Sequence, residues 1–181
     1  TVNGEIRSVM RTVHKKTFAK QEGYNEIYTE NGHLFYTGTY IINNEKIVEN
    51  DLFHYYYTNG NIEDEGKFTN GEKTGIWSHY NKEGILEYQT DYESLTLSYF
   101  YPNGKIRATG PYAIFFSKNE PSGTWKFYYE NGICECEGTY YDSLKYGKWK
   151  YYAADNTFVK KIRHQKYTAN YNYNFLEACK W

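Results

Sequence analysis

The sequence predicts an all-β fold, an elongated single antiparallel sheet of successive β-hairpins with irregular N- and C-terminal caps. A glycine suited to a tight turn recurs at even spacings, and aromatic residues recur at set distances from it. Between turns, apolar and polar residues alternate as they do along strands. Aromatic residues make up 20% of the 181 residues, and 23 are Tyr, which suits half-buried strand surfaces.

Each hairpin is located by its turn glycine, which follows Asn in five copies and Glu83 in one. These glycines are Gly4, Gly32, Gly60, Gly84, Gly104 and Gly132. Asn-Gly between aromatic runs predicts a type I′ turn, which needs positive φ at both central residues. Successive turn glycines lie 28, 28, 24, 20 and 28 residues apart, and Asn156 marks a seventh, degenerate turn 24 residues on.

Even spacing preserves the faces of a sheet, because strand side chains alternate with period two. We assign the variation in length to loops that precede each Gly-x-Trp and change in steps of four residues. The glycines expected to be structural in the repeat are Gly32, Gly60, Gly84, Gly104, Gly132, Gly138 and Gly147.

Alternation also gathers aromatic side chains on one face of the predicted sheet. The candidate binding face consists of Tyr55, Trp77, Tyr99, Tyr101, Trp125, Phe127, Tyr129, Trp149 and Tyr151. One interpretation is packing of the sheet on itself, with Trp rings covering turn glycines. The other is a ligand-binding groove, since exposed aromatic surface often marks a binding site, and the two interpretations are compatible.

The chain is divided into three parts by the repeat. Residues 1–22 are expected to form an N-terminal capping half-repeat, residues 23–156 the hairpin repeats, and residues 157–181 a C-terminal cap. Caps are needed because an open sheet edge invites aggregation.

Charge is unevenly distributed although the net charge is only −1. Residues 1–22 and 155–181 each carry +3, whereas residues 23–154 carry −7. An acidic body disfavours nucleic acid as a partner. We interpret the basic ends as solvated surface, with contact to an anionic partner as the alternative.

The cysteines and histidines predict no chemistry. The three cysteines are too few and odd in number for a disulfide framework. Cys134 and Cys136 are expected on one strand face as buried thiols. His54 and His79 are expected on opposite faces, unable to share a metal ion.

The carboxylates and hydroxyls are equally uninformative. Glu63 and Glu65 are expected on a solvated strand face, and no Ser lies in a nucleophile motif. The sequence therefore predicts no catalytic residue, no metal site and no cofactor, and we expect no enzyme activity.

The pattern Gly-x-Trp-x-x-Tyr, Asn-Gly, Glu-Gly-x-Tyr resembles the bacterial variant of the MORN repeat. The matching residues are Gly75, Trp77, Tyr80, Gly84, Gly123, Trp125, Tyr128, Gly132, Gly138, Tyr140, Gly147, Trp149 and Tyr152. The resemblance covers residues 23–156 and is strongest over 123–152.

This resemblance implies a role in protein contact, membrane proximity or scaffolding. Chains made only of variant repeats are similar to YwqK-type antitoxins, which implies neutralising a partner protein. We therefore expect a non-enzymatic protein-interaction module, antitoxin-like in its most specific form. The alternatives are a membrane- or envelope-associated scaffold and a carbohydrate-binding sheet. The compartment and the oligomeric state are left open: the cytoplasm is favoured, and a removed export signal stays open because the sequence begins at Thr1.

Overall fold

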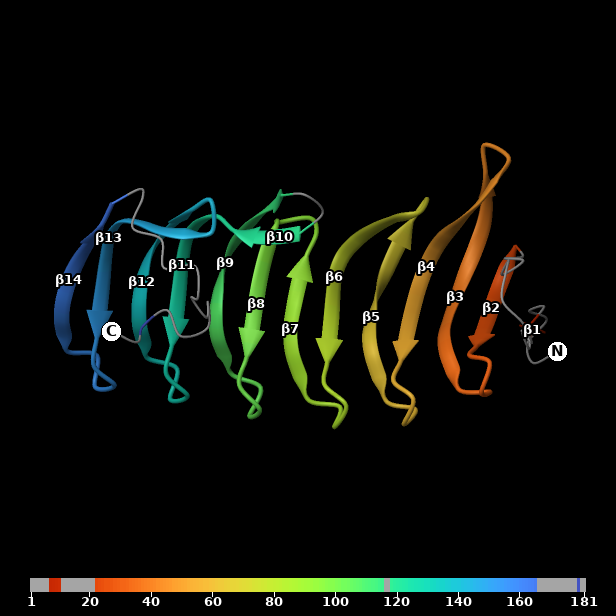
Figure 1. Ribbon diagram of the computed structural model, residues 1–181, viewed down its shortest axis with the longest axis horizontal. Helices are drawn as coiled ribbons and strands as arrows, with labels where there is room; N and C mark the ends of the chain where they lie inside the picture. The colour runs from red at the N-terminus through yellow and green to blue at the C-terminus, as the bar shows by residue number, and fades with distance from the viewer. Residues whose placement is uncertain (1–6, 11–21, 116–117, 166–178, 180–181) are drawn as a thin grey trace. The chain divides into compact units, whose positions relative to one another are not determined.

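A computed structural model of the chain describes residues 7–10, 22–115, 118–165 and 179. The chain forms two compact units, which we describe separately: an N-terminal unit of residues 1–87 and 91–93, and a C-terminal unit of residues 88–90 and 94–181. In each unit the strands lie side by side in chain order (Figure 1). The described residues contain strands and no helix, so the predicted all-β fold of successive antiparallel hairpins is confirmed.

The N-terminal unit is a sheet whose strands follow the order β1 to β6. They are β1 (Arg7–Met10), β2 (Gly23–Tyr28), β3 (Leu34–Asn43), β4 (Lys46–Tyr56), β5 (Ile62–Thr69) and β6 (Glu72–Tyr80). All neighbours are antiparallel except β1 and β2, which pair in parallel. Most of the predicted N-terminal cap lies outside the described residues.

The C-terminal unit repeats the same architecture. Its strands are β8 (Thr96–Phe100), β9 (Ile106–Phe115), β10 (Lys118–Pro121), β11 (Gly123–Tyr128), β12 (Cys134–Tyr141), β13 (Leu144–Tyr152) and β14 (Phe158–His164). Strand β10 pairs with β9 beside the main strand order. Strand β7 (Leu86–Asp91) contributes residues to both units. The predicted C-terminal cap is described only up to residue 165 and at Cys179.

The turns at the Asn-Gly positions are three-residue turns, and the predicted type I′ geometry is wrong there. In the hairpin of β4 and β5, the Gly60 amide donates to the Tyr57 carbonyl at 2.9 Å, and the Tyr57 amide donates to the Asn61 carbonyl at 2.9 Å. Gly60 has a φ of +89°, but Asn59 does not take positive φ. This is a type I turn followed by a left-handed glycine. Asn156, with a φ of +70°, takes the glycine position in the degenerate copy.

Type I′ turns instead close the opposite end of the hairpins, where we had expected loops. Two-residue turns join β3 to β4, β5 to β6 and β12 to β13, with positive φ at Asn44 and Glu45, at Asn70 and Gly71, and at Asp142 and Ser143. Strands β3 and β4 have 10 and 11 residues, whereas β5 and β6 have 8 and 9. Length changes in steps of four because each strand must grow by two residues to keep its faces.

A β-bulge beside each three-residue turn exchanges the two faces of the second strand. Phe127 pairs with Cys136, and the adjacent Tyr128 pairs with Cys134, so Glu135 is the extra residue. Paired residues share a face, while Phe127 and Tyr128 point to opposite faces. The prediction that Cys134 and Cys136 share a face is therefore wrong.

The core of each unit is built from rings lying on glycines of the preceding strand. A Cβ atom added to Gly138 would lie 2.2 Å from the Trp149 ring, and one added to Gly66 would lie 2.3 Å from the Trp77 ring. Phe53 covers Gly38, and Trp125 covers Gly110, in the same way. The rings therefore cover the second-strand glycines and not the turn glycines, around which there is open space.

Candidate functional site

The candidate site is the aromatic face, which we define in each unit as the sheet face that carries the ring of each Gly-x-Trp position. Five of its nine predicted residues are buried: Trp77, Trp125, Phe127, Trp149 and Tyr151. Each Trp is also oriented by its indole N–H, as when Trp125 Nε1 donates to the Pro111 carbonyl at 2.8 Å. These five side chains belong to the cores of the sheets.

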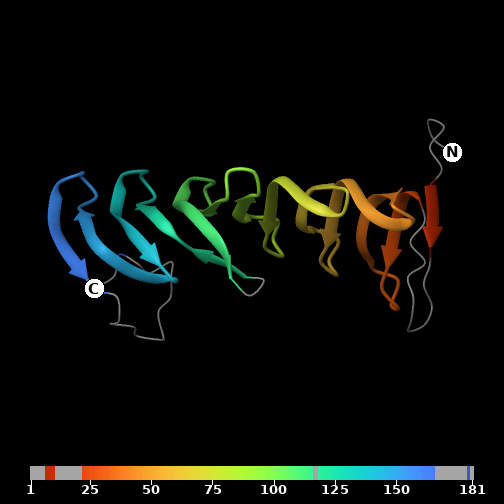
Figure 2. The same cartoon turned by 90° about the horizontal axis from the view of Figure 1, so that it is seen from above.

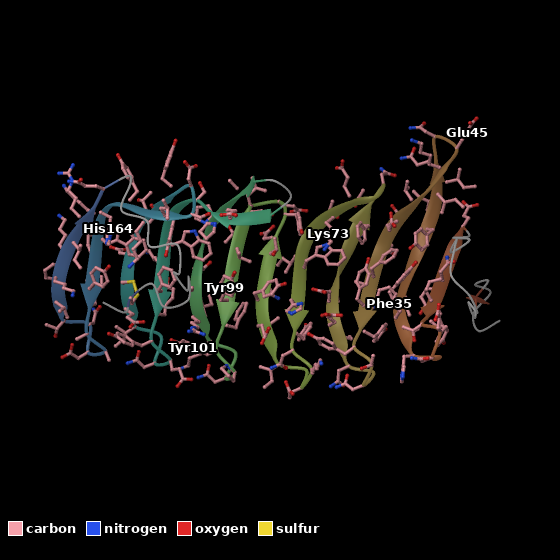
Figure 3. The ribbon with its side chains drawn as sticks, viewed as in Figure 1. Phe35, Glu45, Lys73, Tyr99, Tyr101 and His164 are labelled. Carbon is pink, nitrogen blue, oxygen red and sulfur yellow. A yellow bond between two sulfur atoms is a disulfide. The ribbon has the colours of Figure 1, made fainter. Side chains whose placement is uncertain are left out.

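The other four predicted residues keep part of their surface in water. Tyr55 lies in the N-terminal unit, where its ring centroid is 6.3 Å from that of Trp77. Burial, followed by the nearby Glu49 and Tyr36, raises the pKa of Tyr55 to about 12. In the C-terminal unit, the ring centroid of Tyr99 lies 6.4 Å from that of Trp125, and burial raises the pKa of Tyr99. Figure 3 labels Tyr99 on its strand. Both tyrosines are thus neutral hydrogen-bonding groups at physiological pH.

Tyr101 and Tyr129 connect consecutive hairpins at their turn ends. The Tyr101 hydroxyl donates to the Tyr128 carbonyl at 2.7 Å, and the Tyr129 hydroxyl donates to the Tyr152 carbonyl at 2.9 Å. Tyr57 makes the equivalent bond to the Tyr80 carbonyl at 2.8 Å. These residues are engaged in holding neighbouring hairpins together, and the sequence showed their spacing but not this role.

Phe35 is a residue of the aromatic face that sequence reasoning missed. It is the extra residue of the bulge in β3, and alternation along the strand does not reveal on which face such a residue lies. Its ring centroid lies 6.5 Å from that of Tyr55 and 5.6 Å from that of Tyr36. Phe35, labelled in Figure 3, is 43% exposed. Phe35 and Tyr55 together form an accessible aromatic pair.

A lysine covers a Trp ring in each unit. Lys73 Nζ lies 3.8 Å from the Trp77 ring centroid, and Lys145 Nζ lies 4.5 Å from that of Trp149. Burial lowers the pKa of Lys73, and burial together with the nearby Lys160 lowers the pKa of Lys145 to about 8. The signal was present in the sequence, since each lysine precedes its Trp by four residues.

The last hairpin adds further polar groups to this face. Lys145 Nζ donates to the Tyr151 hydroxyl at 3.2 Å, and Lys160 Nζ lies 5.4 Å from the Tyr151 ring centroid. His164 meets Trp149 edge to face, and its buried Nε2 has no hydrogen-bond partner among the described residues. Burial and the nearby Lys145 lower the pKa of His164, so this imidazole is neutral at pH 7.

The histidines and acids of the N-terminal unit form cross-strand pairs. His79 Nδ1 lies 2.9 Å from Asp64, and His54 Nε2 lies 3.5 Å from Glu65. Asp64 and Glu65 are adjacent in β5, so the two histidines lie on opposite faces as predicted. The acidic run is therefore partly paired, and the expectation of a purely solvated face is corrected.

A disulfide joins Cys136 to Cys179, which lie 43 residues apart in the sequence (Figure 3). Cys136 is buried on the aromatic face between Phe127 and Tyr151, with which it is paired across β11 and β13. The expectation of two buried thiols is wrong for Cys136. Cys134 is the free cysteine among the described residues, and burial raises the pKa of its thiol.

The described part of the chain contains no group of three or more His, Cys, Asp and Glu side chains that could hold a metal ion. A search of the same residues finds no helix with the length and apolar character of a membrane span.

Comparison with known protein families finds a match in two segments of the chain. The family described as MORN repeat variant matches residues 96–113 and 121–141. These segments correspond to the hairpin of β8 and β9 and to Pro121 with the hairpin of β11 and β12. A search of curated proteins finds no match to the chain. The C-terminal unit therefore contains MORN repeat variant sequence in two consecutive hairpins.

Proposed function

We propose that this chain is a non-enzymatic repeat protein that binds another protein through the accessible part of its aromatic face. The proposal is carried by one observation: Phe35 and Tyr55 stay accessible beside a core of buried rings. Surface aromatic residues supported by a rigid framework are typical of protein-binding hot spots. MORN repeats are generally found in protein-interaction or membrane-binding modules, which agrees with this proposal.

The proposal is tested by comparing two double variants in partner capture from the source cell. Phe35→Ser with Tyr55→Ser removes the accessible aromatic pair. Leu52→Ser with Ile76→Ser is the matched control, because both residues are exposed and neighbour the buried Phe53 and Trp77 on the opposite face. We expect the first variant to lose its partner and the control to keep it. Equal capture by two folded variants would contradict the proposal.

An antitoxin-like role is the most specific form of this proposal. It requires that the captured partner be a protein that is toxic to its own cell. Co-expression with the chain should then restore growth, and co-expression with the Phe35→Ser, Tyr55→Ser variant should not. If the partner is harmless, the protein-binding proposal stands without the antitoxin role.

A further inference from the structure

The hairpin of β13 and β14 carries four cations on its outer face, the face opposite the aromatic face. In the register of the two strands, Lys148 is paired with Arg163 and Lys150 with Lys161. All four side chains are exposed. We call these residues the cationic block. Each pair places two like charges directly across the ladder, an arrangement that destabilises a sheet.

The same two positions can be compared in the four other hairpins whose register the structure describes. The pairs there are Tyr24–Thr39 and Glu26–Thr37, Leu52–Lys67 and His54–Glu65, Thr96–Pro111 and Ser98–Thr109, and Thr124–Thr139 and Lys126–Glu137. Each contains a neutral partner or two groups that attract each other. The hairpin fold therefore does not require cations at these positions, and the block calls for a different explanation.

Most of the charge in the block is not neutralised by neighbouring groups. Lys150 Nζ lies 2.7 Å from Glu137. Lys148, Lys161 and Arg163 form no ion pair with any other residue that the structure describes. The cationic block thus forms a net positive surface that would attract an anionic partner.

Strand β14 is also the outermost strand of the C-terminal unit, as Figure 2 shows. Among the described residues it pairs with β13 alone. Cations on an edge strand protect against aggregation, and this protection explains Lys161 and Arg163. Edge protection does not explain Lys148 and Lys150, because β13 has a neighbouring strand on each side.

We propose that β14 and the cationic block bind an extended acidic segment of a partner protein, which adds to the sheet as a strand. This inference rests on the proposed protein-binding function and specifies the chemistry of the partner. An added strand satisfies the backbone groups of the edge. Its alternate side chains lie on the outer face beside Lys161 and Arg163, so Asp or Glu is expected at every second position.

A peptide fits these features better than a lipid surface or a nucleic acid. Phosphate groups would use only the charge of the block, whereas a peptide uses the charge and the backbone of β14 together.

The test uses a ten-residue fluorescent peptide of alternating Glu and Thr, titrated into the full-length protein at low salt. A second peptide has the same sequence with every amide N-methylated, so it keeps its charge but loses its donors. Amide chemical shifts in β14 report where binding occurs. We expect binding of the first peptide with shifts in β14, and no binding of the second.

Two protein variants complete the test. Lys161→Gln with Arg163→Gln should weaken binding of the first peptide about tenfold, because two charge-assisted contacts are lost. Lys82→Gln with Lys105→Gln removes the same charge from exposed positions elsewhere and should change affinity less than about twofold.

Equal binding of the two peptides would overturn strand addition. An equal loss of peptide affinity in the two double variants would contradict the assignment of the binding site to the cationic block. If the protein bound no peptide but bound tightly to vesicles in which one-fifth of the lipid is phosphatidylserine, or to an oligo-thymidine, the peptide proposal would be overturned. The cationic block would then be assigned to lipid or to nucleic acid. The Phe35 and Tyr55 variants test the proposed function separately, because they leave β14 intact.

Discussion

The two units share one structural device and differ in charge. In the N-terminal unit Phe53 covers Gly38 and Trp77 covers Gly66, and in the C-terminal unit Trp125 covers Gly110 and Trp149 covers Gly138. Residues 23–93, however, carry four lysines against thirteen acids, a net charge of −9, whereas residues 94–165 carry ten cations against six acids, a net charge of +4. The repeat is thus defined by its buried rings and glycines, and its outer face is free to acquire different charge.

The largest expected difference between the units comes from the disulfide, which only the C-terminal unit has among the described residues. Cys179→Ser should lower the free energy of unfolding of that unit by about 4 kcal/mol in the chain-entropy account of so long a loop. Hydrogen exchange, read separately over the two units, checks this. Cys134→Ser is the matched control, and equal loss of protection in both units would contradict the prediction.

The ring-over-glycine contact should be equally important in both units. Gly66→Ala and Gly138→Ala each force a Cβ into a Trp ring and should cost about 3 kcal/mol, as overpacking of a core does. Gly132→Ala places its Cβ in open space and should cost about 1 kcal/mol for its positive φ. Urea unfolding of the three variants gives the comparison. A Gly138 variant no worse than the Gly132 variant would refute the contact.

The lysines over Trp77 and Trp149 predict a dependence of stability on pH. Folding lowers the pKa of Lys145 from 10.5 to about 8, so the folded state disfavours the charged amine. The cost of burying the charged amine is present in full below pH 8 and disappears as pH rises toward the pKa of the unfolded state. Lys145 therefore makes the free energy of unfolding increase as pH rises from 8 toward 10. Lys145→Met should flatten this rise in urea unfolding. If the free energy of unfolding of Lys145→Met rose with pH as steeply as that of the unchanged protein, burial would not disfavour the charged form of Lys145. Lys73→Met is the parallel variant in the other unit.

The smallest expected effects concern the tyrosine hydroxyls that join neighbouring hairpins. Tyr57→Phe and Tyr129→Phe each remove one hydrogen bond to a carbonyl and should cost about 1 kcal/mol. The similar geometry predicts similar losses, measured as shifts in the urea midpoint. A large loss at only one position would show that the two units hold their hairpins together differently.

Much of the fold could be predicted because its signals are local. The turn glycines, the even spacing and the alternation of aromatic residues each depend on a few neighbouring residues, and the hairpins follow from them. The faces of the second strands were misassigned because a bulge at residues such as Phe35 and Glu135 shifts the alternation by one. Nothing in the composition of those strands marks which residue will be the extra one.

The candidate site was less predictable for the same reason. The nine aromatic positions could be placed on one face, but which rings are buried depends on what the adjacent strands place beside them. Trp125 and Trp149 are buried against glycines and Phe127 and Tyr151 beside Cys136, whereas Tyr55 and Tyr99 stay partly in water. Their binding role stays a prediction, and Phe35 joins them only through the bulge.

Local sequence patterns were enough to predict the all-β class, the positions of the turns and the repeat variant found in two hairpins, because these depend on backbone preferences and on period-two patterning. The three-dimensional structure was needed to show which rings are core, that Cys136 pairs with Cys179, and that Lys148 and Lys150 lie opposite Arg163 and Lys161. Those relations join residues up to 43 positions apart. They depend on strand register, on burial and on contacts between residues distant in the sequence, and no local pattern along the chain encodes these.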